Sequence, residues 1–187
     1  MLNQFFDKYI FTNTLKYTHN NFFLVDVPFL IIPVDVLIEM IKSSDKEFRR
    51  KIYSMFKEST KKDLLPRFAK LGLEKNKKLD FVKTFFIASG WGKIDVIDLD
   101  VETKRAIIVL ENSPFANELK GKVNFEVDII SRAILAGVFS EFFGEEIDCV
   151  EVECACMNKP ACKLIIKPTA EFDLSKEIVQ DQLPLGE

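Results

Sequence analysis

All four cysteines of this chain lie within fourteen positions, from Cys149 to Cys162. They belong to two runs rich in valine and isoleucine, separated by the stretch Met-Asn-Lys-Pro at positions 157–160. Thiolates are strong ligands for zinc, and a close pair of thiols can be oxidised to a disulfide. The cluster can therefore be a metal site, a disulfide pair or a set of small buried side chains.

The two runs predict a β-hairpin with its turn centred on Asn158. Cys154 and Cys162 would then lie directly opposite each other, with Cβ atoms about 4.5 to 5.5 Å apart, close enough to share a metal ion or to be oxidised. Regular strand alternation places Cys156 on the same face and Cys149 and Glu151 on the other. On geometry alone, the best trio of ligands is Cys154, Cys156 and Cys162.

The composition is that of a single globular domain spanning residues 1–187, because 48% of the side chains are apolar and 29% are charged. The N-terminus lacks the pattern of a signal peptide, and no apolar run approaches the length of a membrane span. We expect a cytoplasmic protein with no membrane partner. A lasting disulfide is disfavoured in a reducing cytosol, which leaves a metal site or plain burial for the cysteines.

The net charge of -3 excludes a strongly basic nucleic-acid binder. Between Lys46 and Lys78, twelve Lys and Arg stand against four acids. This excess can be the solvated face of a helix or a docking surface for an anionic partner. No aromatic residues alternate with these lysines as base stacking would require, so we expect no nucleic-acid partner.

The first half of the chain is predicted to be rich in helices. Short strands are expected within Phe22–Pro33, and a helix follows from Pro33. Asp45 can cap a long helix whose apolar stripe includes Phe48, Met55 and Phe56 and which Pro66 should kink. A further helix is predicted over Leu79–Ala88.

The second half has a different pattern. Alternating residues between Ile94 and Leu110 predict a β-hairpin, Val123–Phe143 predicts a buried helix, and the cysteine segment supplies a second hairpin. Gly137 within the buried helix indicates a close approach by another backbone or a ligand. Residues 170–187 give only weak signals. The predicted fold class is α+β, in which an antiparallel sheet from two hairpins packs with the helix-rich N-terminal half and the long buried helix.

From Tyr53 onward, the stretches "SGWGKIDVIDLD", "VLENSPFANELKG", "AILAGVFSEFFG" and "VEVECACMNKPACKLII" resemble the 4-vinyl reductase domain family. The first 50 residues match only in the order of helices and strands. The resemblance implies a fold shared with the sensory domains of phenol-responsive transcription activators and with subunits of the transport-protein-particle tethering complex.

The resemblance also implies a structural zinc ion held by Glu151, Cys154 and Cys162, with Asp128 where relatives have a cysteine on the preceding helix. Because strand alternation separates Glu151 from Cys154, this ligand set requires a bulge between them. Cys156 could replace Asp128 or Glu151 as a ligand. Four buried thiols without a metal are the alternative.

Several aromatic residues fall on elements that the family packs around a ligand cavity: Phe81, Phe85, Trp91, Phe115 and Phe139. They imply a hydrophobic or aromatic ligand, although aromatic residues at helical spacing are also common in plain cores. The first hypothesis is accordingly a small-molecule-binding sensory domain, which would form a homodimer through the helices before Gly90 and act through a separate signalling or enzyme partner.

Two alternatives differ in class. One is an accessory or substrate-carrying component of a vinyl-group reductase, and the other is a dimeric scaffold. The sequence has no dinucleotide-binding or phosphate-binding motif, and its single histidine, His19, lies in the weakly matched part. We therefore assign no catalytic residue, and an enzyme of this kind would need an external electron donor.

Overall fold

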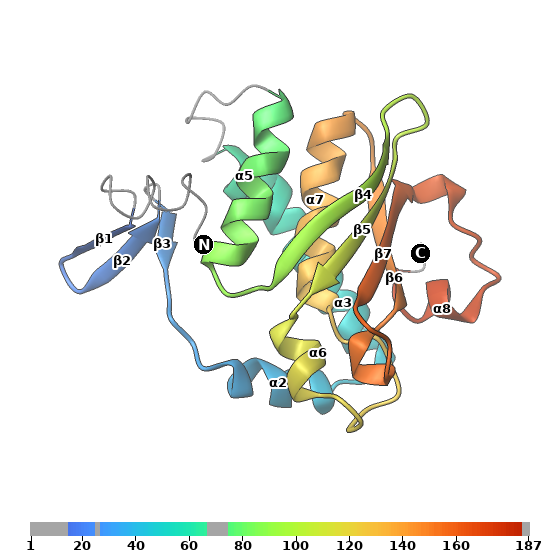
Figure 1. Cartoon of the computed structure of the whole chain (residues 1–187), viewed down its shortest axis with the longest axis horizontal. Coiled ribbons are helices and arrows are strands. Elements are labelled where there is room, and N and C mark those ends of the chain that lie inside the picture. Colours follow the sequence, from blue (N-terminus) through green and yellow to red (C-terminus); the bar gives the residue numbers. More distant parts are fainter. Residues whose placement is uncertain (1–14, 25–26, 67–74, 185–187) are drawn as a thin grey trace.

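Two antiparallel sheets and several helices make up the chain in a computed structural model that describes residues 15–24, 27–66 and 75–184. One sheet has three strands in the order β1-β2-β3, and the other has four in the order β4-β5-β7-β6. Figure 1 shows the smaller sheet set apart from the larger one. The predicted α+β class is confirmed.

The small sheet consists of β1 (Leu15–Thr18), β2 (Asn21–Leu24) and β3 (Val27–Phe29). Two residues with positive φ, His19 and Asn20, form the tight turn between β1 and β2. The prediction of short strands within Phe22–Pro33 is confirmed for β2 and β3, whereas β1 was not predicted. An extended segment leads from this sheet to α2 (Figure 1).

Helix α2 (Val34–Lys42) follows Pro33 as predicted, and α3 (Lys46–Ser59) begins after Asp45. The Asp45 carboxylate caps α3 by accepting a hydrogen bond from the Phe48 N–H at 2.7 Å. After α3 the chain forms a π-helical turn, η1 (Thr60–Leu64). The predicted continuation beyond Pro66 falls on residues 67–74, which lie outside the described part.

The buried face of α3 differs from the predicted apolar stripe. Phe48, Met55 and Phe56 are 46%, 61% and 38% exposed, whereas Tyr53 and Lys57 are buried. The physical reason is a buried polar partner on the sheet: the Asp148 carboxylate lies 2.7 Å from the Lys57 ammonium and accepts a hydrogen bond from the Tyr53 hydroxyl at 2.9 Å.

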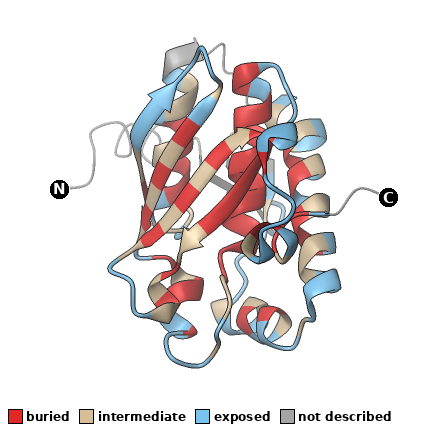
Figure 2. Cartoon of the chain, turned by 90° about the vertical axis from the view of Figure 1, so that its right-hand side faces the viewer, coloured by how far each residue is buried: buried red, intermediate tan, exposed pale blue. Residues whose placement is uncertain are grey.

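Helix α5 (Lys75–Ala88) begins four residues before its predicted start and leads into the large sheet. Strands β4 (Lys93–Asp100) and β5 (Arg105–Glu111) form the predicted first hairpin. Strand β7 (Cys162–Pro168) lies between β5 and β6 (Ile147–Glu153), so the two hairpins join through β5 and β7. Buried and half-buried residues alternate along β5 and β7 (Figure 2).

Between the hairpins lie a short helix, α6 (Pro114–Glu118), and the buried helix α7 (Ile129–Phe143). All residues of α7 except Glu141 are buried, because the helix packs between α3 and strand β6. It begins six residues later than the predicted start at Val123. Residues 123–128 are non-helical and bring Asp128 to the N-cap position of α7.

Gly137 lies where α7 meets α3 and η1. A Cβ atom at this position would be 2.8 Å from the Cβ of Thr60 and 3.0 Å from the carbonyl oxygen of Lys57. The predicted close approach is therefore present, and it is made by the neighbouring helical segment.

The segment after β7 contains η3 (Thr169–Glu171) and a short helix, α8 (Glu177–Gln180). Phe172, Val179 and Leu183 in this segment are buried, and α8 contacts β6. None of the described helices is long and apolar enough to cross a membrane.

Candidate metal centre

The four residues predicted as metal ligands converge at one end of the large sheet. Asp128, Glu151, Cys154 and Cys162 are all buried, and one ligand atom from each lies within 4.8 Å of the other three. They come from the N-cap of α7, from β6, from the residue after β6 and from the first residue of β7.

A bulge in β6 brings Glu151 and Cys154 together. Glu151 pairs with Leu164, and the next paired residue, Glu153, is opposite Lys163, so Val152 is the extra residue. The bulge that the family pattern requires is present, and it explains why simple alternation put Glu151 and Cys154 on opposite faces. Asn158, with φ of 65°, occupies the predicted centre of the turn, in a conformation that asparagine tolerates.

Asp128 has one occupied carboxylate oxygen and one free one. Its side chain does not cap α7; its Oδ1 accepts a hydrogen bond from the Ser113 hydroxyl at 2.5 Å. Its Oδ2 is buried and has no hydrogen-bond partner among the described residues. Sequence reasoning missed Ser113, although a serine directly before Pro114 is a typical helix N-cap, and Ser113 does accept a hydrogen bond from the Ala116 N–H.

Glu151 shows the same division. Its Oε2 accepts a hydrogen bond from the backbone N–H of Asp128 at 3.1 Å, whereas its Oε1 is buried without a partner in the described part of the chain. Buried polar atoms are nearly always hydrogen-bonded, so two orphaned oxygens in one four-residue group are unusual. A cation placed among the four ligand atoms would satisfy both oxygens.

Burial makes the two carboxyl groups costly to ionise without such a cation. It raises the pKa of Asp128 to about 6, and burial together with the Asp128 charge raises the pKa of Glu151 well above its ordinary value. A bound divalent cation would reverse this cost by pairing with both carboxylates.

The thiols form a hydrogen-bonded group. Cys154 Sγ lies 3.1 Å from Cys156 Sγ and 3.9 Å from Cys162 Sγ. Hydrogen bonds from these two thiols lower the pKa of Cys154 to about 2, and the same contacts raise the pKa of Cys156 and of Cys162. Cys154 is thus favoured as the thiolate, the form that binds metal.

The two remaining cysteines lie outside the four-ligand group. Cys156 Sγ lies 3.5 Å from the carbonyl oxygen of Phe125. Cys149 is fully buried, its pKa is raised by burial, and its carbonyl oxygen accepts a hydrogen bond from the Arg132 guanidinium at 2.9 Å. The trio derived from simple strand geometry, which included Cys156, is therefore not the set that the fold brings closest together.

The aromatic residues predicted to bind a ligand lie in the core as packed pairs. Phe81 and Phe85 stack on α5 with ring centroids 6.4 Å apart, and Trp91 contacts Phe115 at 5.7 Å. Phe139 on α7 contacts Phe143 at 5.5 Å. Trp91 is half-buried and the other four predicted residues are buried.

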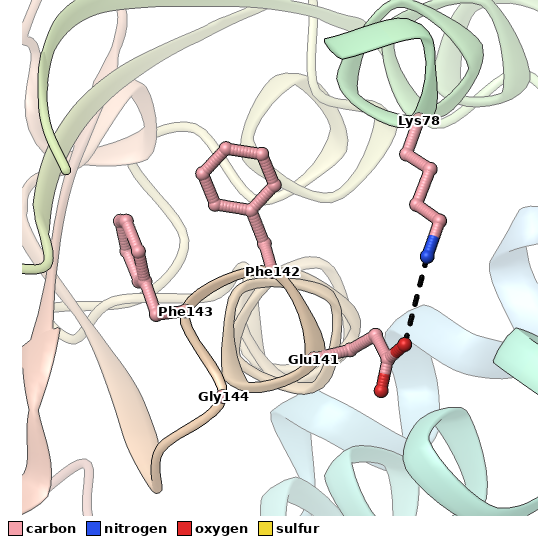
Figure 3. A pocket seen from close by; sticks show the side chains of 5 residues that line it. All are labelled: Lys78, Glu141, Phe142, Phe143 and Gly144. Atoms are coloured by element: carbon pink, nitrogen blue, oxygen red, sulfur yellow. Dashed lines mark ion pairs between the residues drawn. The ribbon is translucent and has the colours of Figure 1, made fainter. Parts of the chain in front are cut away.

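An open pocket of about 280 Å³ lies beside these aromatics, between the start of α5 and the end of α7 (Figure 3). It is lined by Lys78, Glu141, Phe142, Phe143 and Gly144. The Lys78 ammonium and the Glu141 carboxylate pair across it at 3.6 Å. None of the five predicted aromatic residues lines this pocket, but Phe139 contacts Phe142 in its wall at 6.0 Å.

The sequence model of the 4-vinyl reductase domain matches residues 107–168, which include β5, α6, α7 and both strands of the cysteine hairpin. No curated protein sequence matches the chain.

Solved structures share the fold at low sequence identity. The phenol-responsive sensory domain of the transcription activator PoxR, solved with phenol, superposes with a TM-score of 0.74 at 15% identity, covering 92% of this chain and 94% of that domain. A trafficking protein particle complex subunit 3 from Naegleria fowleri, covalently bound to palmitic acid, gives a TM-score of 0.52 at 13% identity, with coverages of 72% and 89%. A vinyl-4-reductase family protein from Methanocaldococcus jannaschii gives 0.47 at 18%, with coverages of 74% and 83%.

Proposed function

Because residues 107–168 belong to the 4-vinyl reductase domain family, we propose that this chain is a small-molecule-binding sensory domain whose last hairpin is stabilised by a structural zinc ion. The sensory assignment is supported by the shared fold with the phenol-responsive domain of PoxR, which covers nearly the whole length of both chains. The zinc assignment is supported by the chain's own residues.

The observation that carries the zinc site is the pair of orphaned carboxylate oxygens beside two thiols. Asp128 Oδ2 and Glu151 Oε1 are buried and unpartnered within the described residues, and both belong to the group that includes Cys154 and Cys162. Each carboxylate keeps its other oxygen in a hydrogen bond, as ligating carboxylates generally do. The set offers one free ligand atom from each of four residues.

Two sulfur and two oxygen ligands suit zinc better than magnesium or calcium, which prefer sites made of oxygen alone. Structural zinc sites have four protein ligands in tetrahedral geometry. Cys154 already favours the thiolate, and Cys162 would lose its proton on binding, so zinc uptake releases protons.

Asp128 and Glu151, rather than Cys156, complete the ligand set in this proposal. Cys156 approaches the Phe125 carbonyl and the Cys154 sulfur, and it is not one of the four residues whose ligand atoms lie within 4.8 Å of one another. We assign Cys156 a hydrogen bond to the Cys154 thiolate.

The zinc ion would join three elements that no single strand pairing connects. Asp128 precedes α7, Glu151 and Cys154 end β6, and Cys162 begins β7. Holding these points together fixes the end of α7 against the last hairpin. Zinc in this position stabilises the fold, and no residue beside it is assigned to catalysis.

The small-molecule ligand in this proposal is hydrophobic or aromatic and contacts Phe81, Phe85, Trp91, Phe115 and Phe139. Their rings supply an apolar surface from three helices and the turn before β4. The adjacent open pocket gives solvent access to the wall formed by Phe142, which packs against Phe139.

We further propose that the domain forms a homodimer and passes its signal to a separate protein. The exposed apolar residues Phe48, Met55 and Phe56 on α3 support a second copy as the partner on this helix, because such residues are depleted on solvated surfaces. The partner that receives the signal is a protein whose chemistry the described surface does not specify.

Native mass spectrometry of the protein purified without added metal tests the zinc ion and the dimer together. We expect a dimer with one zinc per chain, and the same sample after denaturation should release any bound apolar compound. A metal-free protein that takes up no zinc on reconstitution would refute the zinc site.

Trp91 is the only tryptophan, so its fluorescence reports on the proposed ligand site. Phenol and palmitic acid serve as an aromatic and an aliphatic probe, titrated into wild type and into Phe115→Leu, which alters the ring 5.7 Å from Trp91. Saturable binding to wild type that weakens in the variant supports the site. If neither probe nor any co-purified compound binds, the sensory assignment is wrong.

A further inference from the structure

The C-terminal segment, residues 177–184, lies along strand β6 and is held by two cations of α3. The Lys46 ammonium pairs with the Asp181 carboxylate at 2.7 Å, and the Arg50 guanidinium donates to the Gln180 carbonyl oxygen at 2.8 Å. Val179 and Leu183 of the segment are buried. These contacts attach the segment to α3 and to the core.

Gln182 makes the most specific contact of this segment. Its side chain is buried, its Oε1 accepts a hydrogen bond from the Glu151 N–H at 2.8 Å, and its Nε2 donates to the Glu151 carbonyl oxygen at 2.7 Å. A primary amide has one acceptor and one donor side, so it occupies both backbone groups of one residue as a neighbouring strand would. That residue is one of the four that form the candidate metal centre.

The other outward-facing groups of β6 are bound by side chains from helices. The Tyr53 hydroxyl accepts from the Cys149 N–H, the Arg132 guanidinium donates to the Cys149 carbonyl, and the Ser140 hydroxyl accepts from the Ile147 N–H. Those three side chains belong to α3 and α7. Gln182 is the member of this series carried by a segment near the end of the described chain.

We propose that Gln182 is a positioning residue for the metal ligand Glu151, and that the C-terminal segment and the metal are thermodynamically coupled. The proposal rests on the zinc site of the proposed function. The two amide hydrogen bonds hold the Glu151 backbone directly before the β6 bulge, and this orientation directs Oε1 toward Asp128, Cys154 and Cys162. Without Gln182, two buried backbone groups lose their partners and the peptide at the bulge is free to rotate.

Coupling of this kind is reciprocal. If the docked segment raises the affinity for zinc, bound zinc must hold the segment on β6 by the same factor. Zinc occupancy would therefore set how often residues 177–184 leave the sheet edge. A partner that captures the released segment would draw zinc from the site.

The test compares Gln182→Ala with the neighbouring Asp181→Asn, which removes an anchor of the same segment but leaves the amide clamp in place. Zinc affinity is measured by competition with a chromophoric chelator, and hydrogen exchange of the Glu151 amide is measured by NMR with and without zinc. We expect Gln182→Ala to bind zinc about 10-fold or more weakly, as removal of outer-shell partners generally does. Asp181→Asn should stay within about 2-fold of wild type.

A second variant, Gln182→Glu, keeps the side-chain length and the acceptor for the Glu151 N–H but loses the donor to the carbonyl. We expect weaker zinc binding than in wild type, even if Gln182→Ala is poorly folded. In the zinc-free protein, the Glu151 amide should exchange faster in Gln182→Ala than in wild type, and zinc should protect residues 177–184 in wild type.

The outcomes separate the two proposals. If wild type binds zinc and both Gln182 variants bind it with unchanged affinity, the coupling is wrong and the zinc site stands. If wild type binds no zinc, the zinc site and the coupling both fail, while faster amide exchange in zinc-free Gln182→Ala would still establish the clamp.

Discussion

Asp128→Asn is expected to have opposite effects on the metal-free and the metal-bound protein. Asparagine has the shape of aspartate and can still accept the Ser113 hydrogen bond, but it removes the buried negative charge and replaces one carboxylate oxygen with an NH₂ group. In the metal-free protein, this change relieves the desolvation of Asp128. In the metal-bound protein, it removes a ligand.

The magnitude follows from the pKa of Asp128. Burial raises this pKa from 3.8 to about 6, so at pH 7 the ionised side chain lowers the folding stability by about 3 kcal/mol relative to a neutral one. Metal-free Asp128→Asn should therefore be more stable than metal-free wild type at pH 7 by up to that amount. Part of the gain is lost because Glu151 and Asp128 influence each other's ionisation.

The assay is urea unfolding at pH 7 in the presence of a chelator, followed by zinc titration of the folded variants. Asp148→Asn is the matched control, because Asp148 is also a buried acid but has direct partners in Lys57 and Tyr53. Removing one partner of a buried ion pair destabilises a protein by about 3 to 5 kcal/mol, so this control should lose stability. A metal-free Asp128→Asn protein that is less stable than wild type and still binds zinc tightly would refute this reasoning.

The remaining predictions concern pH, the thiols and the helix packing. The raised folded-state pKa of Asp128 and Glu151 means that metal-free wild type should gain stability as the pH falls from 7 to 5, since the folded state takes up protons there, whereas Asp128→Asn should respond less; urea midpoints at the two pH values measure this, and a loss of stability on acidification would contradict it. Cys154→Ser and Cys162→Ser should abolish bound zinc and lower the Tm, whereas Cys149→Ser and Cys156→Ser should retain zinc; elemental analysis and thermal melts check this, and loss of zinc from Cys156→Ser alone would place Cys156 in the ligand set. Gly137→Ala should reduce stability by about 1 to 3 kcal/mol because its Cβ would lie 2.8 Å from Thr60, and the double variant with Thr60→Ser should recover part of the loss in urea unfolding. Unchanged stability of Gly137→Ala would mean that α3 and α7 separate easily at this point.

The sequence predicts most of the large sheet because its signals are local. The alternating residues of β4 and β5, the N-cap Asp45 and the close approach at Gly137 each follow from side-chain types within one short stretch. The start of α7 was misplaced because residues 123–128 are apolar enough to extend the helical pattern, and only the tertiary position of Asp128 ends it.

The candidate site is less accessible to local reasoning. Strand alternation alone puts Glu151 on the wrong face, because a bulge is a pairing between two strands and leaves little trace in one of them. Ser113 and Gln182 contact the site from segments 15 and 31 residues away from the ligands they touch. Phe48, Met55 and Phe56 have the spacing of a core stripe and are nevertheless exposed, since the opposite face of α3 carries the polar partners of Asp148.

The saturated edge of β6 also bears on how the protein avoids aggregation. An edge strand with free backbone groups is a template on which another chain can add a strand. At Ile147, Cys149 and Glu151 that template is already covered by hydroxyl, guanidinium and amide groups. Growth of the sheet by a second chain would therefore be directed to the opposite edge, where β4 carries Asp95, Asp98 and Asp100 and an irregular register at Val96 and Asp98. Like charges brought together there repel each other, so each side of the sheet resists fibre growth by different means.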